Sequence, residues 1–192
     1  MNAKILLAVV AAFLVAACAG AGRSRADLAI YDLGPALLPS SPGPSGVAVE
    51  VRLPVWLDGL AMNYRLNYAD PLRVHGYAQA RWAASPVQLL QQRLRQQLAL
   101  AATVAPCTLR VELDDFSQSF ASPAASAAVL RGEALLLGKG LAPQARLPVQ
   151  IDVPAASADA AGGAAALAAG ADRLAAALAG WLRDQDLAAC RS

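Results

Sequence analysis

The residue with the clearest chemistry in this sequence is Cys18, which ends the run Leu14-Val-Ala-Ala-Cys. This run has the form of a bacterial lipobox, in which a signal peptidase cuts before the cysteine and that cysteine then carries lipid. Lys4, an apolar region and small residues precede the cut, as in a secretory signal. The apolar region is shorter than the ~20 residues that a membrane-spanning helix needs. We therefore predict a signal peptide at residues 1–17 and lipidation of Cys18, with an ordinary signal cut elsewhere as the alternative.

Two further cysteines, Cys107 and Cys190, remain once Cys18 is lipidated. An even number of cysteines in an oxidising compartment favours a disulfide. We predict that this bond joins the start of a central strand to the end of the last helix. It would close a loop of roughly 80 residues, which the chain-entropy model equates with about 4–5 kcal/mol. The alternative is two unpaired thiols.

The other residues that could do chemistry do not form a recognisable catalytic set. His75 is the single histidine, and no Gly-x-Ser-x-Gly motif stands near it. Asp114 and Asp115 are adjacent carboxylates, but neighbours on a strand point to opposite faces. The cysteines lack metal-ligand spacing. We therefore predict no enzyme, no catalytic residue, no metal and no cofactor.

A region rich in aromatic residues and arginine runs from Trp56 to Trp82, and both residue types are enriched at protein interfaces. Tyr64 and Tyr68 share the apolar side of their predicted strand, so we assign them to the core. The alternative is that the other aromatic residues also fill the core. The residues that we predict to contact a partner are Trp56, Arg65, Arg73 and Arg81.

The leader and the cysteines predict a location outside the cytoplasm, and length and composition predict a small domain. The apolar fraction of 57% and the mean hydropathy of +0.41 are raised by the leader and by alanine, and no later apolar stretch is long enough to span a membrane. Net charge is +2, without a basic run, so nucleic acid is not a predicted partner. Residues 18–27 are predicted to be a lipidated tether, and residues 28–192 a single domain.

Alternating apolar residues predict strands, with weaker signals at 28–33 and 73–80 and clear ones at 47–53, 62–68 and 109–113. The apolar side then changes at Phe116, which predicts a β-bulge near Asp114 and Asp115. Residues 127–137 and 145–153 are expected to form a hairpin, and Pro148 favours an edge position for the second arm.

Two helices are predicted. In the first, Ser85 can cap the helix, Pro86 suits its first position and Gln88 completes a capping box. Arg93 falls on the polar side of this helix, together with Gln92, Arg95 and Gln96. The second helix is rich in alanine and is expected to start near Ser157, with Gly162 and Gly163 delaying its regular part.

The order of these elements predicts an α+β fold: a single domain with a mostly antiparallel sheet and two main helices packed on one face. A split βαβ arrangement is compatible with this order, and the strand order cannot be read from the sequence.

The whole pattern resembles the ABC-type transport auxiliary lipoprotein family. The resemblance rests on the lipobox and on a series of short matches: Tyr31-Asp32-Leu33-Gly34-Pro35, Trp56-Leu57-Asp58, Tyr64-Arg65-Leu66, Tyr77-Ala78-Gln79-Ala80-Arg81-Trp82, Ser85-Pro86, Gln92-Arg93-Leu94, Leu113-Asp114-Asp115-Phe116 and Trp181 in the late helix.

The resemblance implies an outer-membrane lipoprotein on the periplasmic face, anchored in lipid through Cys18. Its implied partners are an MCE-domain protein and the inner-membrane components of an ABC transporter that moves lipid, with a homo-oligomer left open. Asp after the lipidated cysteine favours retention in the inner membrane, whereas this chain has Ala19. Two other hypotheses stand beside docking: a periplasmic carrier that holds lipid in an apolar groove, and a periplasmic hydrolase that depends on His75.

Overall fold

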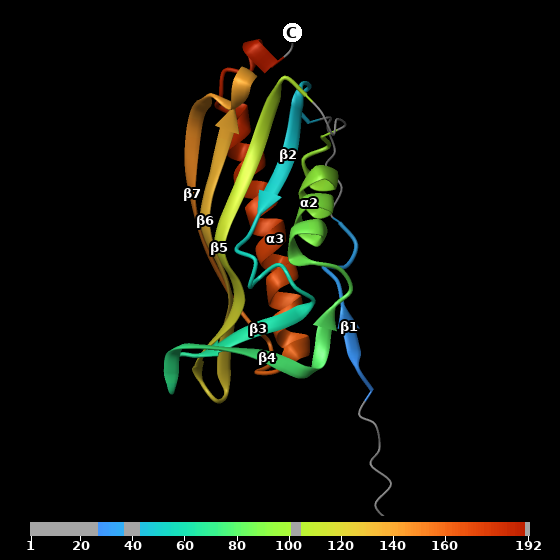
Figure 1. Ribbon diagram of the computed structural model, residues 1–192, viewed down its shortest axis with the longest axis vertical. Helices are drawn as coiled ribbons and strands as arrows, with labels where there is room; N and C mark the ends of the chain where they lie inside the picture. Colours follow the sequence, from blue (N-terminus) through green and yellow to red (C-terminus); the bar gives the residue numbers. More distant parts are fainter. Residues whose placement is uncertain (1–26, 37–42, 101–104, 191–192) are drawn as a thin grey trace, which may run out of the picture.

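The computed structural model describes residues 27–36, 43–100 and 105–190 (Figure 1). The predicted signal peptide, Cys18 and all of the predicted tether except Asp27 lie outside these residues, so their assignment remains a prediction.

Strands and helices follow the predicted order closely. The described elements are β1 (Ala29–Tyr31), β2 (Val47–Arg52), β3 (Ala61–Leu66), β4 (Asp70–Trp82), α2 (Pro86–Gln97), β5 (Cys107–Ser122), β6 (Ala125–Leu137), the short 3₁₀ helix η1 (Lys139–Leu141), β7 (Pro143–Pro154), α3 (Ala160–Arg183) and the 3₁₀ helix η2 (Ala188–Cys190). The fourth strand is much longer than its predicted range of 73–80.

The strands form one mixed sheet in the order β1-β4-β3-β5-β6-β7, and β2 also pairs with β5. The α+β single domain is confirmed, but the sheet is less antiparallel than expected. β1 pairs with β4 in parallel, and β5 is long enough to pair in parallel with β2 near its start and with β3 near its end. The other three pairings are antiparallel. Strands β2, β3 and β5 therefore run in the same direction. This is possible because β4 and α2 lie between β3 and β5 in the chain and bring it back to the end at which β2 starts.

The predicted bulge lies in β5, where the register with β6 shifts between Leu113 and Asp115. Gly132 of β6 is opposite Leu113 and has a φ of +148°, in the region that favours glycine. A Cβ at this position would collide with the carbonyl oxygen of Glu112. The bulge turns the inward side of the strand from Leu113 to Phe116, and both residues are buried.

The start of α2 follows the sequence: the hydroxyl of Ser85 accepts a hydrogen bond from the Gln88 amide at 3.4 Å, and Pro86 takes the first helical turn. The prediction for Arg93 was wrong, because this side chain is only 5% exposed. Its guanidinium donates to Asp172 of α3 and to the carbonyl of Gly34 at 2.9 Å. Burial of Arg93 therefore joins the two helices.

The last helix, α3, begins later than predicted, at Ala160, and its capping residue is Asp159. The Asp159 carboxylate accepts from the amide of Gly162 at 2.8 Å and from the hydroxyl of Ser157 at 2.8 Å. Gly162 and Gly163 do not delay the helix, since both are buried within its first turn. A Cβ on Gly163 would collide with the side chain of Gln118, so this glycine lets the helix approach β5.

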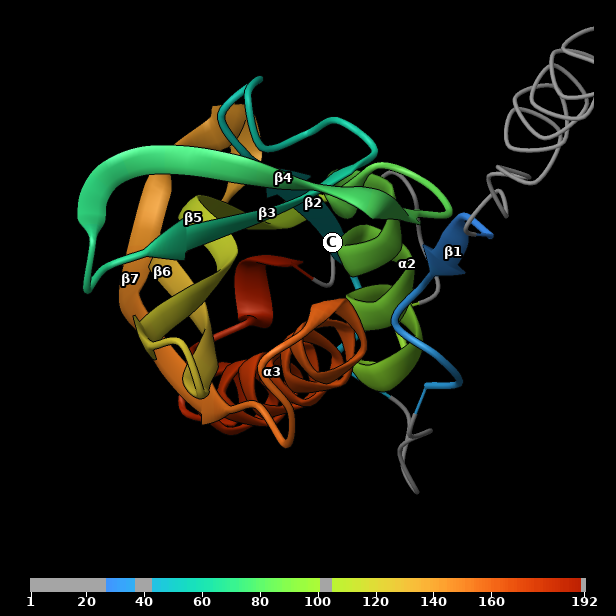
Figure 2. The same ribbon diagram turned by 90° about the horizontal axis from the view of Figure 1, so that it is seen from below.

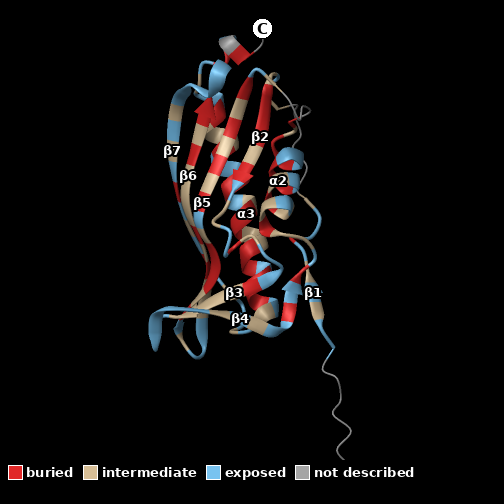
Figure 3. Ribbon diagram, in the orientation of Figure 1, coloured by how far each residue is buried: buried red, intermediate tan, exposed pale blue. Residues whose placement is uncertain are grey.

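Both helices pack on one face of the curved sheet, α2 against β2 and α3 against β6 and β7 (Figures 1 and 2). The core lies between them and the sheet and includes Leu90, Leu109, Leu130 and Leu178, each less than 1% exposed (Figure 3). By length and composition α3 could cross a membrane, contrary to the expectation from the sequence. This is weak evidence for a span, because 44% of its apolar window is buried within the domain, as in a core helix.

A disulfide joins Cys107 at the start of β5 to Cys190 in η2, with an S–S distance of 1.97 Å and a Cα–Cα distance of 5.2 Å. The second cysteine lies in a short 3₁₀ helix after α3 rather than in α3 itself. Both cysteines are buried, so the bond closes one end of the core.

Candidate functional site

The four residues predicted to contact a partner all lie at one end of the molecule. We call this region the β3–β4 end: strands β3 and β4 and the loop at 53–60. Figures 1 and 2 show that β4 crosses this end of the molecule, and that β1 begins beside it. Within the region the structure brings Trp56 into contact with Arg65, while Arg73 and Arg81 are exposed residues of β4.

The loop before β3 is held firmly enough to display two apolar side chains. Leu57 is 1% exposed and fixes the loop to the core. The Asp58 carboxylate accepts from the amide of Val87 in the first turn of α2 at 3.2 Å. Between these anchors and β2, Val55 is 92% exposed and Trp56 is 49% exposed. Exposure of such side chains on an anchored loop is a feature of contact surfaces.

The guanidinium of Arg65 lies over the Trp56 ring, 5.4 Å from its centroid. This is within the ~6 Å range of a cation–π contact. The same guanidinium donates to the carbonyls of Pro71 and Leu72, at 3.4 Å each. These contacts orient Arg65 across the outer surface of the hairpin, and its positive charge stays without a carboxylate.

None of Arg65, Arg73 and Arg81 has a carboxylate within 4.0 Å among the described residues. Other arginines do: the ion pairs include Arg52, Arg93, Arg110, Arg131 and Arg146. An exposed cation without a partner keeps its full capacity to bind an anionic group. The β3–β4 end thus offers two exposed cations, Arg73 and Arg81, and the half-buried Arg65, beside exposed apolar side chains.

Sequence reasoning missed several exposed apolar residues of this end. Leu72 is 88% exposed and Val74 is 38% exposed, and Val74 is paired across the strands with Arg65. Tyr68, predicted to be in the core, is 47% exposed. It lies beyond the end of β3, in the turn, where strand alternation no longer sets its direction. The positions of Leu72 and Val74 depend on register, which sequence alternation alone does not give.

The inner side of the same strands carries an aromatic cluster centred on Tyr64. Its ring centroid lies 4.6 Å from that of Tyr77, 5.1 Å from that of His75 and 5.6 Å from that of Phe120. Tyr77 donates to Gln118 at 2.8 Å, and burial raises the pKa of this tyrosine above its usual value. This cluster is packing that supports β3 and β4 from inside.

The same cluster accounts for His75, whose ring stacks on Tyr64 with an angle of 15° between the planes. Within the described parts of the chain, no group of three or more histidine, cysteine or acidic residues is arranged to hold a metal.

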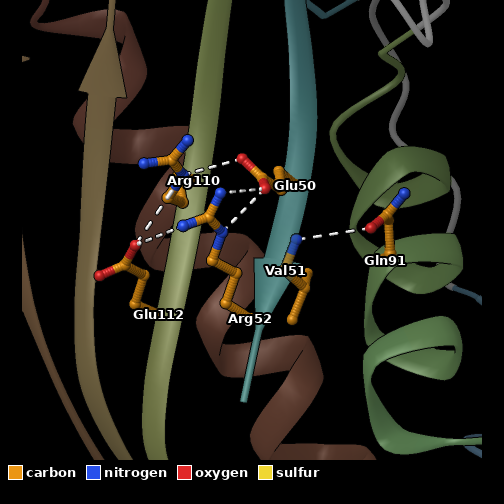
Figure 4. Close-up of polar contacts among 6 residues, drawn as sticks. All are labelled: Glu50, Val51, Arg52, Gln91, Arg110 and Glu112. Atoms are coloured by element: carbon orange, nitrogen blue, oxygen red, sulfur yellow. Dashed lines mark hydrogen bonds and ion pairs between the residues drawn. The ribbon is translucent and has the colours of Figure 1, made fainter. Parts of the chain in front are cut away.

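A network of charges on β2 and β5 was not predicted from the sequence (Figure 4). Glu50 accepts from Arg52 and from Arg110, both at 2.8 Å, and Glu112 lies 3.8 Å from each arginine. Burial alone would raise the pKa of Glu50, but the hydrogen bonds from Arg110 and Arg52 hold it below its usual value. The network satisfies its own charges, so it is a poor candidate for binding a charged ligand.

An open groove of about 330 Å³ lies between β1 and the first turns of α3. Its lining is mostly apolar and includes Ile30, Leu33, Ala161, Ala164, Ala165 and Ala168. An apolar hollow between sheet and helix is the feature that the carrier hypothesis predicts.

Comparison with protein families gives one match. The family model for the ABC-type transport auxiliary lipoprotein component matches residues 31–179, which is more than half of the chain. No curated protein matches the sequence.

Among the solved structures that share the fold, two match this chain over most of their length. One is protein XCC0632 from Xanthomonas campestris, described under the family model DUF330. It has 22% sequence identity and a TM-score of 0.68, and the match covers 79% of this chain and 93% of that one. The other is an uncharacterized protein with 20% identity and a TM-score of 0.63, and this match covers 81% of this chain and 99% of that one. At these identities the likeness concerns the fold alone.

Proposed function

The chain belongs to the ABC-type transport auxiliary lipoprotein family, and from this we propose that it is a non-enzymatic docking subunit of a lipid transport system. In this proposal the lipid on Cys18 holds the protein at the outer membrane on the periplasmic side. The β3–β4 end binds an MCE-domain protein, which connects it to the inner-membrane ABC transporter.

The observation that carries the proposal is the unpaired charge at the β3–β4 end. Arg65, Arg73 and Arg81 have no carboxylate partner among the described residues, and Trp56 lies under Arg65. Charged and aromatic groups of this kind stabilise interfaces when a partner supplies carboxylates and excludes water. If these arginines were buried within the domain, each would need a carboxylate of its own, as Arg93 has in Asp172.

The predicted tether leads from the membrane to the same end of the domain as the proposed contact surface. A tether of residues 18–27 spans at most about 35 Å when fully extended, and β1 begins at the same end of the molecule as β4 (Figure 1). Several buried acyl chains on one cysteine, at about 0.8 kcal/mol per methylene, make release from the membrane negligible. The tether therefore confines the contact surface to a shell close to the membrane.

Binding of an MCE-domain protein, chosen from the genes beside this one, tests the contact surface. We expect the triple variant Arg65→Gln, Arg73→Gln, Arg81→Gln to bind at least about tenfold more weakly than the wild type, since each lost charge-assisted contact costs about 1.5–3 kcal/mol. Arg95→Gln on α2, another exposed arginine without an ion pair among the described residues, is the matched control. Unchanged binding by the triple variant would show that the surface lies elsewhere.

The anchor is tested in cells with Cys18→Ala. The variant should fold and bind the partner in solution, but it should be released from the outer-membrane fraction and fail to support transport. Normal transport by this variant would contradict the proposed role of the lipid.

The groove between β1 and α3 favours a second candidate function, that of a lipid carrier. Native mass spectrometry of the protein without its anchor distinguishes the two. Phospholipid bound in a one-to-one ratio, and lost in Ala165→Trp, would support the carrier; an empty protein that still binds its partner would support docking alone.

A further inference from the structure

Among the described residues the sheet has four outer edges: those of β7, β2 and β1, and the part of β4 that β1 leaves uncovered. The edge of β1 is only three residues long, and those of β7 and β2 are protected. β7 carries Pro143, Pro148 and Pro154, which cannot donate a backbone hydrogen bond. The outer edge of β2 faces α2, where the Gln91 side chain accepts from the amide of Val51 at 3.4 Å (Figure 4). Natural proteins protect edges in these ways because an open edge pairs readily with another strand.

The edge of β4 is different. β1 pairs with this strand at Ala80, Arg81 and Trp82, so its outer side has no strand partner from Asp70 to Gln79 among the described residues. Figure 2, which views the molecule from this end, shows β4 crossing in front of the rest of the sheet. Gly76, Ala78 and Gln79 are exposed, as expected for an uncovered edge.

The start of this edge is already satisfied locally. The amide of Leu72 donates to Asp70 at 3.0 Å, and Arg65 donates to the carbonyls of Pro71 and Leu72. The open part is therefore the stretch from Arg73 to Gln79, long enough to pair with a typical strand of about 5–6 residues.

We propose that the open edge of β4 binds an extended, acidic strand of a partner protein by β-strand addition. This inference rests on the proposed docking function and names the chemistry of its partner. Main-chain hydrogen bonds to residues 73–79 provide affinity, and side chains provide specificity. Arg73 within the stretch and Arg81 beyond it are free cations that select carboxylates on the incoming strand.

Two other occupants fit less well. A second copy of the chain, paired edge to edge, would add its own unpaired arginines to the interface, and the edge from Arg73 to Gln79 has no carboxylate to match them. A bilayer would satisfy the exposed apolar residues, but it would leave backbone N–H and C=O groups without partners at the hydrocarbon boundary, which is costly. An acidic strand satisfies the backbone groups and the charges at once.

Hydrogen exchange of the wild-type protein with and without the MCE-domain partner tests the inference directly. In the complex we expect the exchange rates of amides between residues 73 and 79 to fall by at least about tenfold, because these amides become strand-paired. Binding without protection of β4 would overturn the strand-addition inference and leave the docking function intact. No binding at all would overturn both.

Further measurements exclude the other occupants. Protection of β4 that rises with the concentration of this protein alone would show a second copy at the edge. Protection on adding vesicles of anionic phospholipid, without the partner, would show a membrane contact. Either result would overturn the inference.

Two proline variants test the backbone contacts. The register between β3 and β4 shifts between Gly76 and Arg81, so proline, which removes a backbone donor, is placed at Ala78 and at Gln79 in separate variants. Neither position has a register partner in β3. We expect one of them to weaken binding about tenfold, and Ala78→Val, which keeps its N–H, to bind normally. Full binding by both proline variants would overturn the inference.

The charge is tested with Arg73→Glu, which should weaken binding more than Arg73→Gln does, because it repels an acidic strand. Arg95→Glu, with the same change of charge on α2, should have little effect. Tighter binding by Arg73→Glu would show that the incoming strand is basic and overturn the inference.

Discussion

The ion pairs of the domain lie in its helix-covered body, and none lies at the β3–β4 end among the described residues. In the body, formed by β2, β5, β6, β7 and the two helices, Arg52 and Arg110 share Glu50, and Arg93 is buried against Asp172. At the β3–β4 end Arg65, Arg73 and Arg81 have no carboxylate partner within the described residues. An unpaired arginine alone does not mark a binding surface, since Arg95 on α2 is also without an ion pair among the described residues. The β3–β4 end differs because its unpaired arginines lie beside exposed apolar side chains.

The same division appears in the strand edges. The edges of the body are closed, one by prolines and the other by α2, whereas the edge of β4 is open. The unpaired arginines and the uncovered strand edge therefore both lie at the β3–β4 end. The comparison predicts that substitutions in the body lower stability, and that substitutions at the β3–β4 end lower partner binding.

The largest loss of stability is expected for Asp172→Ala. This change leaves the buried Arg93 without its counter-charge. Breaking a fully buried pair costs about 3–5 kcal/mol, and because the Asp172 side chain is 28% exposed we expect the lower end of that range. Urea denaturation measures it, with Arg183→Ala, at an exposed position of the same helix, as the control. A loss below about 1 kcal/mol would show that water or another group satisfies Arg93.

Reduction of the disulfide should have the next largest effect. Cys107 and Cys190 are 83 residues apart, and removal of a native disulfide typically costs about 2–5 kcal/mol. We expect Cys107→Ala with Cys190→Ala to unfold at lower urea than the wild type, and reductant to shift the wild type alone. Equal stability of the wild type and the double variant in the absence of reductant would contradict a stabilising role of the disulfide.

A smaller effect is expected at the start of α3. Asp159→Ala removes the cap and should cost about 1 kcal/mol at neutral pH. The hydrogen bonds from Gly162 and Ser157 hold the pKa of Asp159 below its usual 3.8. Its contribution is thus complete above that pH and is lost as pH falls through the lower, folded pKa.

Denaturation curves measured from pH 7 down to acid should therefore show the Asp159→Ala and wild-type proteins converging. Asp159→Ser, whose hydroxyl can cap without titrating, serves as the control and should keep its advantage over the alanine variant. A difference that does not change with pH would mean that the carboxylate charge is unimportant.

The smallest effect on stability is expected at the β3–β4 end. Arg73→Gln with Arg81→Gln should change the free energy of unfolding by less than about 0.5 kcal/mol, since exposed residues without partners contribute little. A loss comparable to that of Asp172→Ala would break the comparison, because these arginines would then belong to the fold.

Much of the fold followed from local sequence. Ser85 and Pro86 determined where α2 begins, and the change of apolar side at Phe116 located the bulge of β5. Errors arose where a distant partner decided the outcome. Arg93 was placed on the polar face of its helix, but Asp172, far away in sequence, made its burial favourable. Tyr68 followed the alternation of its neighbours until the strand ended at Leu66.

The sequence predicted which residue types form the candidate site, but it did not predict how those residues are arranged. The sequence by itself determined the lipobox at Cys18, the α+β class and the concentration of arginine and aromatic residues between Trp56 and Trp82, because these depend on local composition and periodicity. Only the tertiary structure decided which arginines meet a carboxylate and which edge of the sheet stays open. Both depend on strand order and register, which are set by contacts between residues far apart in the chain.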